Sequence, residues 1–448
     1  MRHPLSVVGA VLATVGALLF LTFLVAELLD LFTNPYAGLL SFFLFPAIFV
    51  FGLLLIPVGA WLQRRRRLAG KPDASGWPKF DLNDPRQRRW TFFVVAATLV
   101  NIVIVSVAAY SGVEYMETPS FCGQVCHSVM NPEFTAHKDS THSQVACVKC
   151  HVGPGASGFV QSKLTGMRQL ISFTFNTHSR PVPAPVHQLN PARVVCEQCH
   201  WPEKVHGDKV QVIKEYGDDE PNTETITTLD VHVGGGNERL AIATGIHWHM
   251  NIANEVEYIT TDPKRQVIPW VRVKDRQGNV REYLADGVSE ADLAKGERRR
   301  MDCLDCHNRP AHTFDATPEK AVNRLLATGE MSKTLPFLRR EAVAALTEKY
   351  ATQAAGVDAI SRRLGDFYQK NYKDIYAKQR ADVDRAISAT QRAFSRNIHP
   401  SMSITWGTYP NNIGHNDFPG CFRCHDESHK TKDGKTISQD CELCHKMR

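Results

Sequence analysis

The chain has 448 residues, a formal net charge of +6 and a hydrophobic content of 43%, which is compatible with a membrane anchor joined to a folded domain. Much of the positive charge stands in arginine runs at 64–67 and 86–89, so it does not indicate a nucleic-acid-binding surface. There is no P-loop and no G-x-S-x-G nucleophile motif, which argues against the common nucleotide-hydrolysing and serine-hydrolase classes.

Three apolar segments open the chain, at 7–29, 37–62 and 90–110. Each has about the twenty residues that a helix needs to cross a bilayer core. The first is too long for the apolar core of a signal peptide, and no A-x-A-like cleavage site follows it. We therefore predict a membrane anchor with three transmembrane helices over residues 1–115.

The arginine runs predict the orientation of the anchor in the membrane. They lie after the second segment and before the third, whereas the loop between the first two segments carries no positive charge. The positive-inside rule then places the N-terminus and the 63–89 loop in the cytoplasm. The third segment leads outward, so we expect the rest of the chain in the periplasm of a bacterial cytoplasmic (inner) membrane.

All 12 cysteines stand in six pairs, and a histidine follows each pair directly. In c-type cytochromes two thiols attach haem covalently through C-x-x-C, and the histidine that follows ligates the iron. Histidine makes up 19 of 448 residues, so its chance placement after all six pairs is about one in 10⁸. Zinc sites and disulfides give no reason for these histidines. The five regular motifs are Cys147, Cys150 and His151; Cys196, Cys199 and His200; Cys303, Cys306 and His307; Cys421, Cys424 and His425; and Cys441, Cys444 and His445.

The first pair is irregular, because three residues separate Cys122 from Cys126 in the stretch FCGQVCHSVM. It is a decayed motif, a different metal site or a haem site adapted to a separate task, and the histidine that follows, His127, favours a haem. We therefore predict six covalently attached haem c groups. Since no cysteine lies outside a motif, the composition suits an oxidising compartment, as does haem attachment outside the cytoplasmic membrane.

The expected fold is a mainly α and irregular multihaem cytochrome c with N-terminal transmembrane helices, a small β insert and a helical insert. Residues 206–300 alternate like strands, with a hairpin turning at 277–279, and residues 317–397 show helical periodicity after a TPEK capping start. The remaining boundaries are a haem domain at 116–205 (haems 1–3), a haem 4 segment at 301–316 and a C-terminal dihaem segment at 398–448.

Electron-transfer haems normally bind a second axial ligand, and twelve further histidines beyond His3 are available. On a strand, His247 and His249 would point to the same face, so at most one of them would reach a given iron. The preferred candidates are His142, His247, His249, His312, His415 and His429. Those ranked lower are His137, His178, His187, His206, His232 and His399.

The chain resembles the NapC/NirT family of membrane-anchored multihaem cytochromes. The resemblance covers roughly residues 90–200, where a span leads into Cys122, Cys126, His127 and Met130, followed by NPEF and by STHSQVACVKCH. It implies oxidation of quinol and electron transfer to periplasmic reductases. Familiar members have one span, four haems and a C-x-x-C-H-x-M first motif. In that family the methionine can be the axial ligand of haem 1, so the resemblance implies Met130, while the motif itself favours His127.

Haem 1 would be the first cofactor after the third span, and therefore the nearest to the membrane. Quinol oxidation there needs a base for two protons, and an interfacial location can raise a carboxyl pKa towards working pH. The candidate proton acceptors are Glu114, Glu117, Glu133, His137 and Asp139, and Lys138 or Lys163 would orient a quinone oxygen.

Three functions remain open. The leading one is a menaquinol dehydrogenase that passes electrons to a periplasmic cytochrome or reductase. The second is a terminal reductase of nitrite, hydroxylamine or a sulfur oxyanion, although none of the six motifs ends in the lysine typical of such nitrite reductases. The third is a haem-wire subunit of a larger membrane respiratory complex.

Overall fold

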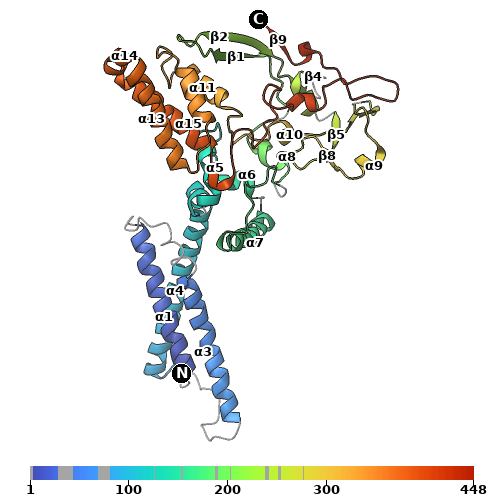
Figure 1. The fold of residues 1–448 in the computed structure, drawn as a ribbon. Coiled ribbons are helices and arrows are strands. Elements are labelled where there is room, and N and C mark those ends of the chain that lie inside the picture. The colour runs from blue at the N-terminus through green and yellow to red at the C-terminus, as the bar shows by residue number, and fades with distance from the viewer. Residues whose placement is uncertain are drawn as a thin grey trace. The chain divides into compact units, whose positions relative to one another are not determined.

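The structure is a computed structural model that describes residues 4–28, 44–68, 81–125, 127–152, 155–186, 190–201, 203–237, 242–250, 254–275 and 277–448 (Figure 1). Among the predicted site residues, Cys126, His187 and the side chain of His127 lie outside this part of the chain. The chain divides into two compact units, Met1–His127 and Ser128–Arg448. Each unit is described by itself.

The first unit contains three helices that are long and apolar enough to cross a membrane, as predicted: α1 (Pro4–Leu28), α3 (Phe45–Leu68) and α4 (Pro85–Met116). Two of them extend beyond the apolar segments. α3 continues through the arginine run, and α4 begins five residues before its predicted start, where the Asp84 side chain accepts the N–H of Arg86. An aspartate N-cap followed by proline is a favourable helix start.

Small residues join α1 to α3. A Cβ atom on Gly9 would stand 2.6 Å from the Gly52 carbonyl oxygen, and one on Gly52 would stand 2.4 Å from the Ala13 nitrogen. The Ser6 hydroxyl donates to the Ile56 carbonyl at 3.0 Å. Lipid tails are as apolar as the side chains of the helices, so the hydrophobic effect does not drive helices together in a bilayer. Small residues allow the two backbones to approach closely, and the resulting van der Waals contacts and hydrogen bonds stabilise the pair. The glycines therefore set the distance between the two helices.

The second unit contains a helical part around one apolar core. Thr317 caps its first helix by accepting the Lys320 N–H, which agrees with the TPEK start expected from the sequence. Leu338, Leu364 and Phe394 are among its fully buried side chains. The helices are α11 (Pro318–Ala327), α12 (Leu338–Thr347), α13 (Gln353–Asn371), α14 (Lys373–Lys378) and α15 (Arg380–Asn397).

The same unit contains small antiparallel sheets, also as predicted, with strand orders β1-β2-β9, β3-β4 and β7-β6-β5-β8. β6 and β7 form the expected hairpin, in which Lys274 pairs with Val280. The strands are β1 (Lys209–Tyr216), β2 (Glu224–Val231), β3 (Gly235–Asn237), β4 (Ile242–Thr244), β5 (Glu255–Thr260), β6 (Trp270–Lys274), β7 (Val280–Leu284), β8 (Glu297–Arg300) and β9 (His445–Met447).

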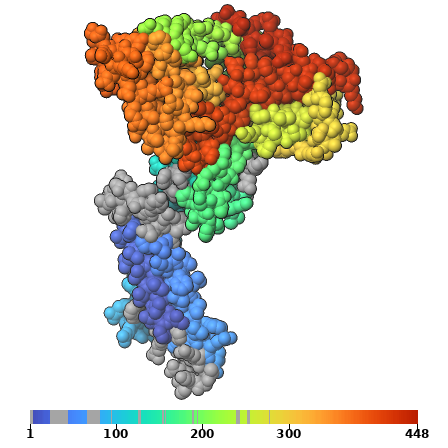
Figure 2. All heavy atoms as spheres, viewed as in Figure 1, coloured from blue at the N-terminus to red at the C-terminus, as the bar shows by residue number. Residues whose placement is uncertain are grey.

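The C-terminal segment, red in Figure 2, contacts both the helical part and the sheets. The Trp406 indole donates to the Leu346 carbonyl at 3.0 Å, and Lys430 forms a bridge with Leu284. Two longer helices, α5 (His127–Lys138) and α7 (Gly155–Thr174), precede or connect the haem motifs. The remaining helical elements are short: α6 (Cys147–His151), α8 (Ala192–Val195), η3 (Cys196–Gln198), η4 (Ile246–Met250), α9 (Glu290–Leu293), α10 (Cys303–Cys306), η5 (Pro400–Met402), η6 (Gly420–Arg423) and η7 (Cys441–Leu443).

Candidate haem-binding sites

The five regular cysteine motifs fold as single helical turns. Motifs two and four lie on α6 and α10, while motifs three, five and six lie on η3, η6 and η7. In motifs three, four and five the histidine N–H donates to the carbonyl of the first cysteine at 2.8, 2.7 and 3.0 Å. Residues three apart on such a turn lie on the same side. Both thiols can therefore face one porphyrin while the histidine follows at the end of the turn.

The first motif differs locally from the others. Its first part, Phe121–Val125, is a π-helical turn called η2, which belongs to the membrane unit. A π turn takes up one residue more than an α turn, and such turns are frequent at functional sites. The additional residue between Cys122 and Cys126 is therefore matched by a wider turn. In the second unit, Met130 lies half-buried on α5.

Every regular motif histidine faces a second histidine from elsewhere in the chain. An imidazole nitrogen binds a transition metal at about 2 Å, so two imidazoles on opposite sides of one iron hold their ring centroids roughly 6 Å apart. The observed separations fit this arrangement. They are His151 and His312 at 6.1 Å, His200 and His142 at 6.1 Å, His307 and His247 at 6.2 Å, His425 and His249 at 5.8 Å, and His445 and His415 at 6.1 Å.

Several of these rings are oriented by a backbone carbonyl at Nδ1. When Nδ1–H donates to an oxygen, the tautomer is fixed and Nε2 is left to bind iron. The contacts are His312 to the Glu133 carbonyl at 2.9 Å, His142 to Pro310 at 3.2 Å, His249 to Ile246 at 2.7 Å and His425 to Ser438 at 2.7 Å. The residues thus fit the bis-histidine haems predicted from the motifs.

His247 and His249 come from one 3₁₀ turn, η4, and not from the strand that we expected. Because η4 is a turn, the two rings face different motif histidines, in motifs four and five. The turn is held against β3 and β4 by two glycines. A Cβ on Gly234 would stand 1.9 Å from the Thr244 oxygen, and Gly234 and Gly245 have φ of +63° and +66°.

His429 differs from the prediction, because the structure places it in a hydrogen-bonded core. It is 1% exposed, its Nδ1 lies 2.8 Å from Asp426, and its Nε2 lies 2.7 Å from the Ile268 carbonyl oxygen. Both ring nitrogens are therefore occupied by protein acceptors. We do not include His429 among the ligands that we propose.

The lower-ranked histidines have other contacts. The ring of His137 also lies 6.0 Å from that of His312, but its Nε2 atom lies 3.0 Å from the Val145 oxygen. His399 is buried, with Nε2 3.2 Å from the Arg396 oxygen. The others are His178, which stacks on Phe173, His206, whose backbone bridges to Gly234, and His232, whose Nδ1 lies 2.9 Å from Asp208.

Motifs two to six lie next to one another in space, in the same order as in the sequence. Burial, together with thiols of motifs two and four, raises the pKa of Cys196 in motif three to about 11. The pKa of Cys306 in motif four is raised to about 11 by burial, and of the motif-five residues Arg423 lowers it while Cys421 raises it. The pKa of Cys444 in motif six is raised by burial and then by Cys421 of motif five. The motifs therefore form a continuous row.

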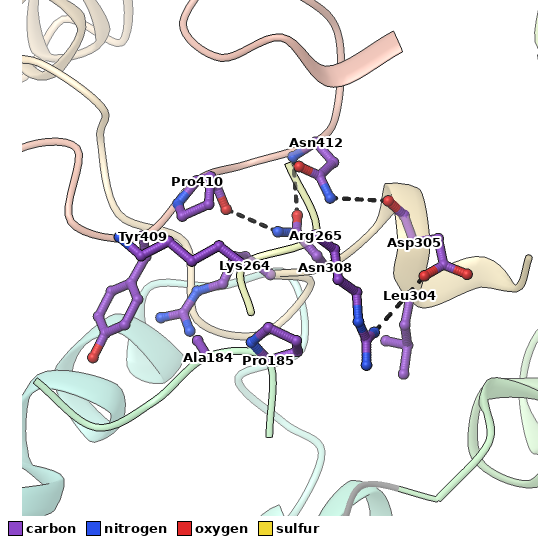
Figure 3. Close-up of a pocket in the computed structure, with 11 residues that line it drawn as sticks. Ala184, Pro185, Lys264, Arg265, Leu304, Asp305, Asn308, Tyr409, Pro410 and Asn412 are labelled. Carbon is purple, nitrogen blue, oxygen red and sulfur yellow. Dashed lines mark hydrogen bonds and ion pairs between the residues drawn. The ribbon is translucent and has the colours of Figure 1, made fainter. Parts of the chain in front are cut away.

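Two hydrogen bonds converge on the Asp305 carbonyl of motif four, beside a small pocket; Figure 3 shows the one from Asn412, and Arg423 of motif five supplies the other. The Asn412 amide donates to the Asp305 carbonyl at 2.9 Å, and Arg423 donates to the same oxygen at 2.8 Å. Asp305 lies inside motif four and accepts the Tyr258 hydroxyl. Burial raises the pKa of the Asp305 carboxyl. These bonds fix the spacing of two consecutive haem segments.

The predicted quinol-site residues are divided between the two units. In the membrane unit, Glu114 and Glu117 are exposed at the end of α4, where Glu117 is the C-cap. In the second unit, Glu133 is not an open carboxylate, because it accepts two hydrogen bonds from Arg309 at 2.9 and 3.2 Å. His137, on α5, is buried. Neither has the environment that we expected of a proton acceptor.

The other candidates are more open. Asp139 is 57% exposed at the side chain and lies 3.8 Å from Arg396. Lys138 and Lys163 each place the ammonium over a ring of their own helix, at 4.3 and 4.8 Å. Their charges remain accessible for an anionic or polar group.

Comparison with known proteins identifies the family. Residues 85–182 match the family model described as NapC/NirT cytochrome c family, N-terminal region. The chain is 40% identical to the cytochrome c-type protein ImcH of Geobacter sulfurreducens over 448 residues, which is 99% of this chain and 88% of that protein. No solved structure matches the chain.

Proposed function

The chain belongs to the NapC/NirT cytochrome c family, and from that premise we propose that it oxidises menaquinol at the membrane and relays the electrons to a periplasmic acceptor. It is a multihaem c-type cytochrome with covalently bound haem c, located in the inner membrane. The proposal adds that all six motifs carry haem. It also places the N-terminus in the cytoplasm and residues from about 112 onward in the periplasm.

The observation that carries the proposal is the pairing of every regular motif histidine with a second imidazole at about 6 Å. We assign His312, His142, His247, His249 and His415 as the second axial ligands of haems two to six in that order. Haem c supplies one-electron redox chemistry at its iron. The chain's own residues would ligate, space and shield these groups, and motifs two to six would hold them in a continuous row.

The proposed ligation also argues against one of the two alternative functions, the terminal reductase, but not against the other, the haem-wire subunit. Two imidazoles close an iron to substrates and favour a low potential. In the proposed assignment only haem one, with His127 or Met130, is left for a different ligation. A terminal reductase would need an open site, and haems two to six do not offer one. A haem-wire subunit would share the ligation and differ only in the electron donor.

The proton acceptors are best sought among the exposed carboxylates. Glu114 and Glu117 end the third membrane helix and precede Cys122 by a few residues. Asp139 is a further candidate, and Lys138 or Lys163 would orient the quinone oxygen. Quinol oxidation releases two protons and two electrons, so a carboxylate there would receive the protons, and a haem held by Cys122 and Cys126 would supply the one-electron acceptor.

The test is reduction of the haems in isolated membranes by a menaquinol analogue. The full chain is compared with Glu114→Gln, Glu117→Gln and a matched control, Asp358→Asn, which is exposed on α13. We expect quinol-driven reduction to slow at least tenfold in one of the first two variants and to be unchanged in the control. Dithionite should reduce all haems in every variant. If the unmodified chain is reduced by dithionite but not by menaquinol, the quinol assignment is wrong.

A further inference from the structure

Helix α7 carries an exposed apolar stripe. Val160, Leu164, Met167, Ile171 and Phe175 are 56%, 69%, 51%, 53% and 72% exposed. Their spacing of three or four residues places them on one face of the helix. Large apolar side chains scattered singly on a surface are ordinary, but a contiguous row indicates a binding surface.

Basic residues border the stripe on both sides. At 100° per residue, Lys163 and Arg168 lie within roughly 80° of the centre of the stripe, one on each edge. The Lys163 ammonium lies over the Phe159 ring at 4.8 Å, so its stem covers apolar surface while its charge stays at the rim. Gln161 is exposed beside Arg168 at one edge of the stripe, and Gln169 is exposed on the opposite side of the helix, about 160° from the centre of the stripe. An apolar face with basic flanks is typical of helices that lie in a membrane interface.

Within the described part of the chain, no other helix or strand packs along α7. Figures 1 and 2 show it at the edge of the second unit, with its side chains on the outside. The same chain crosses the bilayer in α4, which ends at Met116, and α7 begins at Gly155. A chain anchored in this way is always near a lipid surface, which makes lipid the available occupant for an apolar face with basic flanks.

We propose that α7 lies flat in the membrane–water interface, with the stripe in the acyl layer and Lys163 and Arg168 among the headgroups. It is a second membrane contact, added to the three spanning helices. A helix of 20 residues is about 30 Å long, so this contact also restricts rotation of the second unit about the single connection to α4. The inference does not depend on the identity of the electron donor.

The test uses single cysteines in the full-length holoprotein, reconstituted in nanodiscs that contain anionic lipid. All 12 native cysteines stand in haem motifs, so an introduced cysteine is the one left to react after haem attachment. Leu164→Cys and Ile171→Cys probe the stripe. Gln169→Cys, on the opposite side of α7, and Asp358→Cys, exposed on α13, are the controls. Each variant is treated with a charged, water-soluble maleimide and with a lipid-soluble maleimide, and labelling is normalised to denatured protein.

We expect the charged reagent to label the stripe at least tenfold more slowly than the controls, and the lipid-soluble reagent to label it at least as fast. Equal labelling by the charged reagent would show that the stripe faces water. Slow labelling by both reagents would show that a haem or another protein covers it. Either result overturns the proposal. Haem content of each variant confirms that the variant has folded.

Discussion

The pair formed by Glu133 and Arg309 gives the sharpest prediction, because it stands beside one proposed haem ligand. Glu133 Oε2 lies 3.3 Å from His312 Nδ1, and Arg309 lies 2.9 Å from the same carboxylate oxygen. Both side chains are largely buried, at 12% and 10% exposure. Removing one charge leaves the other uncompensated next to the imidazole that faces motif two.

The magnitude follows from Coulomb's law. An iron bound to the far nitrogen of His312 would lie roughly 7 Å from the carboxylate, and at an effective dielectric constant of about 20 the interaction is about 2 kcal/mol. For a one-electron couple this corresponds to a shift of about 100 mV. Arg309→Gln leaves a negative charge that stabilises the oxidised haem, so its potential should fall. Glu133→Gln leaves a positive charge, so the potential should rise.

The assay is a redox titration of the purified holoprotein at pH 8, well above the ordinary carboxyl pKa. One component of the titration should move down in Arg309→Gln, up in Glu133→Gln, and return close to its original value in the double variant. Loss of one partner of a buried pair can destabilise the fold by about 3–5 kcal/mol, so haem content is measured in parallel. Shifts of the same sign in both single variants, or none in fully haem-loaded protein, would refute the reasoning.

Three further outcomes are expected. His415→Ala should convert one haem from low spin to high spin, while His429→Ala should leave the spin states unchanged, as electron paramagnetic resonance will show. Gly234→Ala places a Cβ 1.9 Å from a backbone oxygen at a positive φ, so it should destabilise the fold by at least about 2 kcal/mol and disturb two low-spin haems together; disturbance of only one would contradict the shared turn. Gly52→Leu should lower the melting temperature in detergent by several degrees, whereas Leu54→Ala, at a site 59% exposed, should change it by about a degree or less; equal effects would mean that the glycines do not set the helix distance.

Local sequence patterns predicted the elements well where one physical rule dominates. Twenty apolar residues must form a helix in lipid, so the three spans were predictable, and the 277–279 turn sets the β6–β7 hairpin. The helix ends were less predictable. α3 extends through arginines because a helix that starts in lipid keeps its backbone hydrogen bonds beyond the apolar core.

The candidate sites were predictable only in part, because haem attachment is local in sequence and ligand pairing is not. C-x-x-C-H marks one side of each iron, but nothing local shows that His142 faces His200 or that His312 faces His151. His429 is a comparable case, since its partner Ile268 lies far away in sequence. The sequence predicts Glu133 as a proton acceptor, and only the folded chain shows that Arg309 donates to its carboxylate. These outcomes depend on tertiary contacts.

The η4 turn has a consequence for the rate of electron transfer between the two haems proposed to bind His247 and His249. The tunnelling rate falls steeply with distance, so relative motion of two haems held by separate elements would change the rate. His247 and His249 are two residues apart on one peptide turn, so thermal motion of that turn displaces the two proposed ligands in the same direction. The rate of electron transfer at this step should therefore vary less with domain motion than at a step whose two ligands come from separate elements.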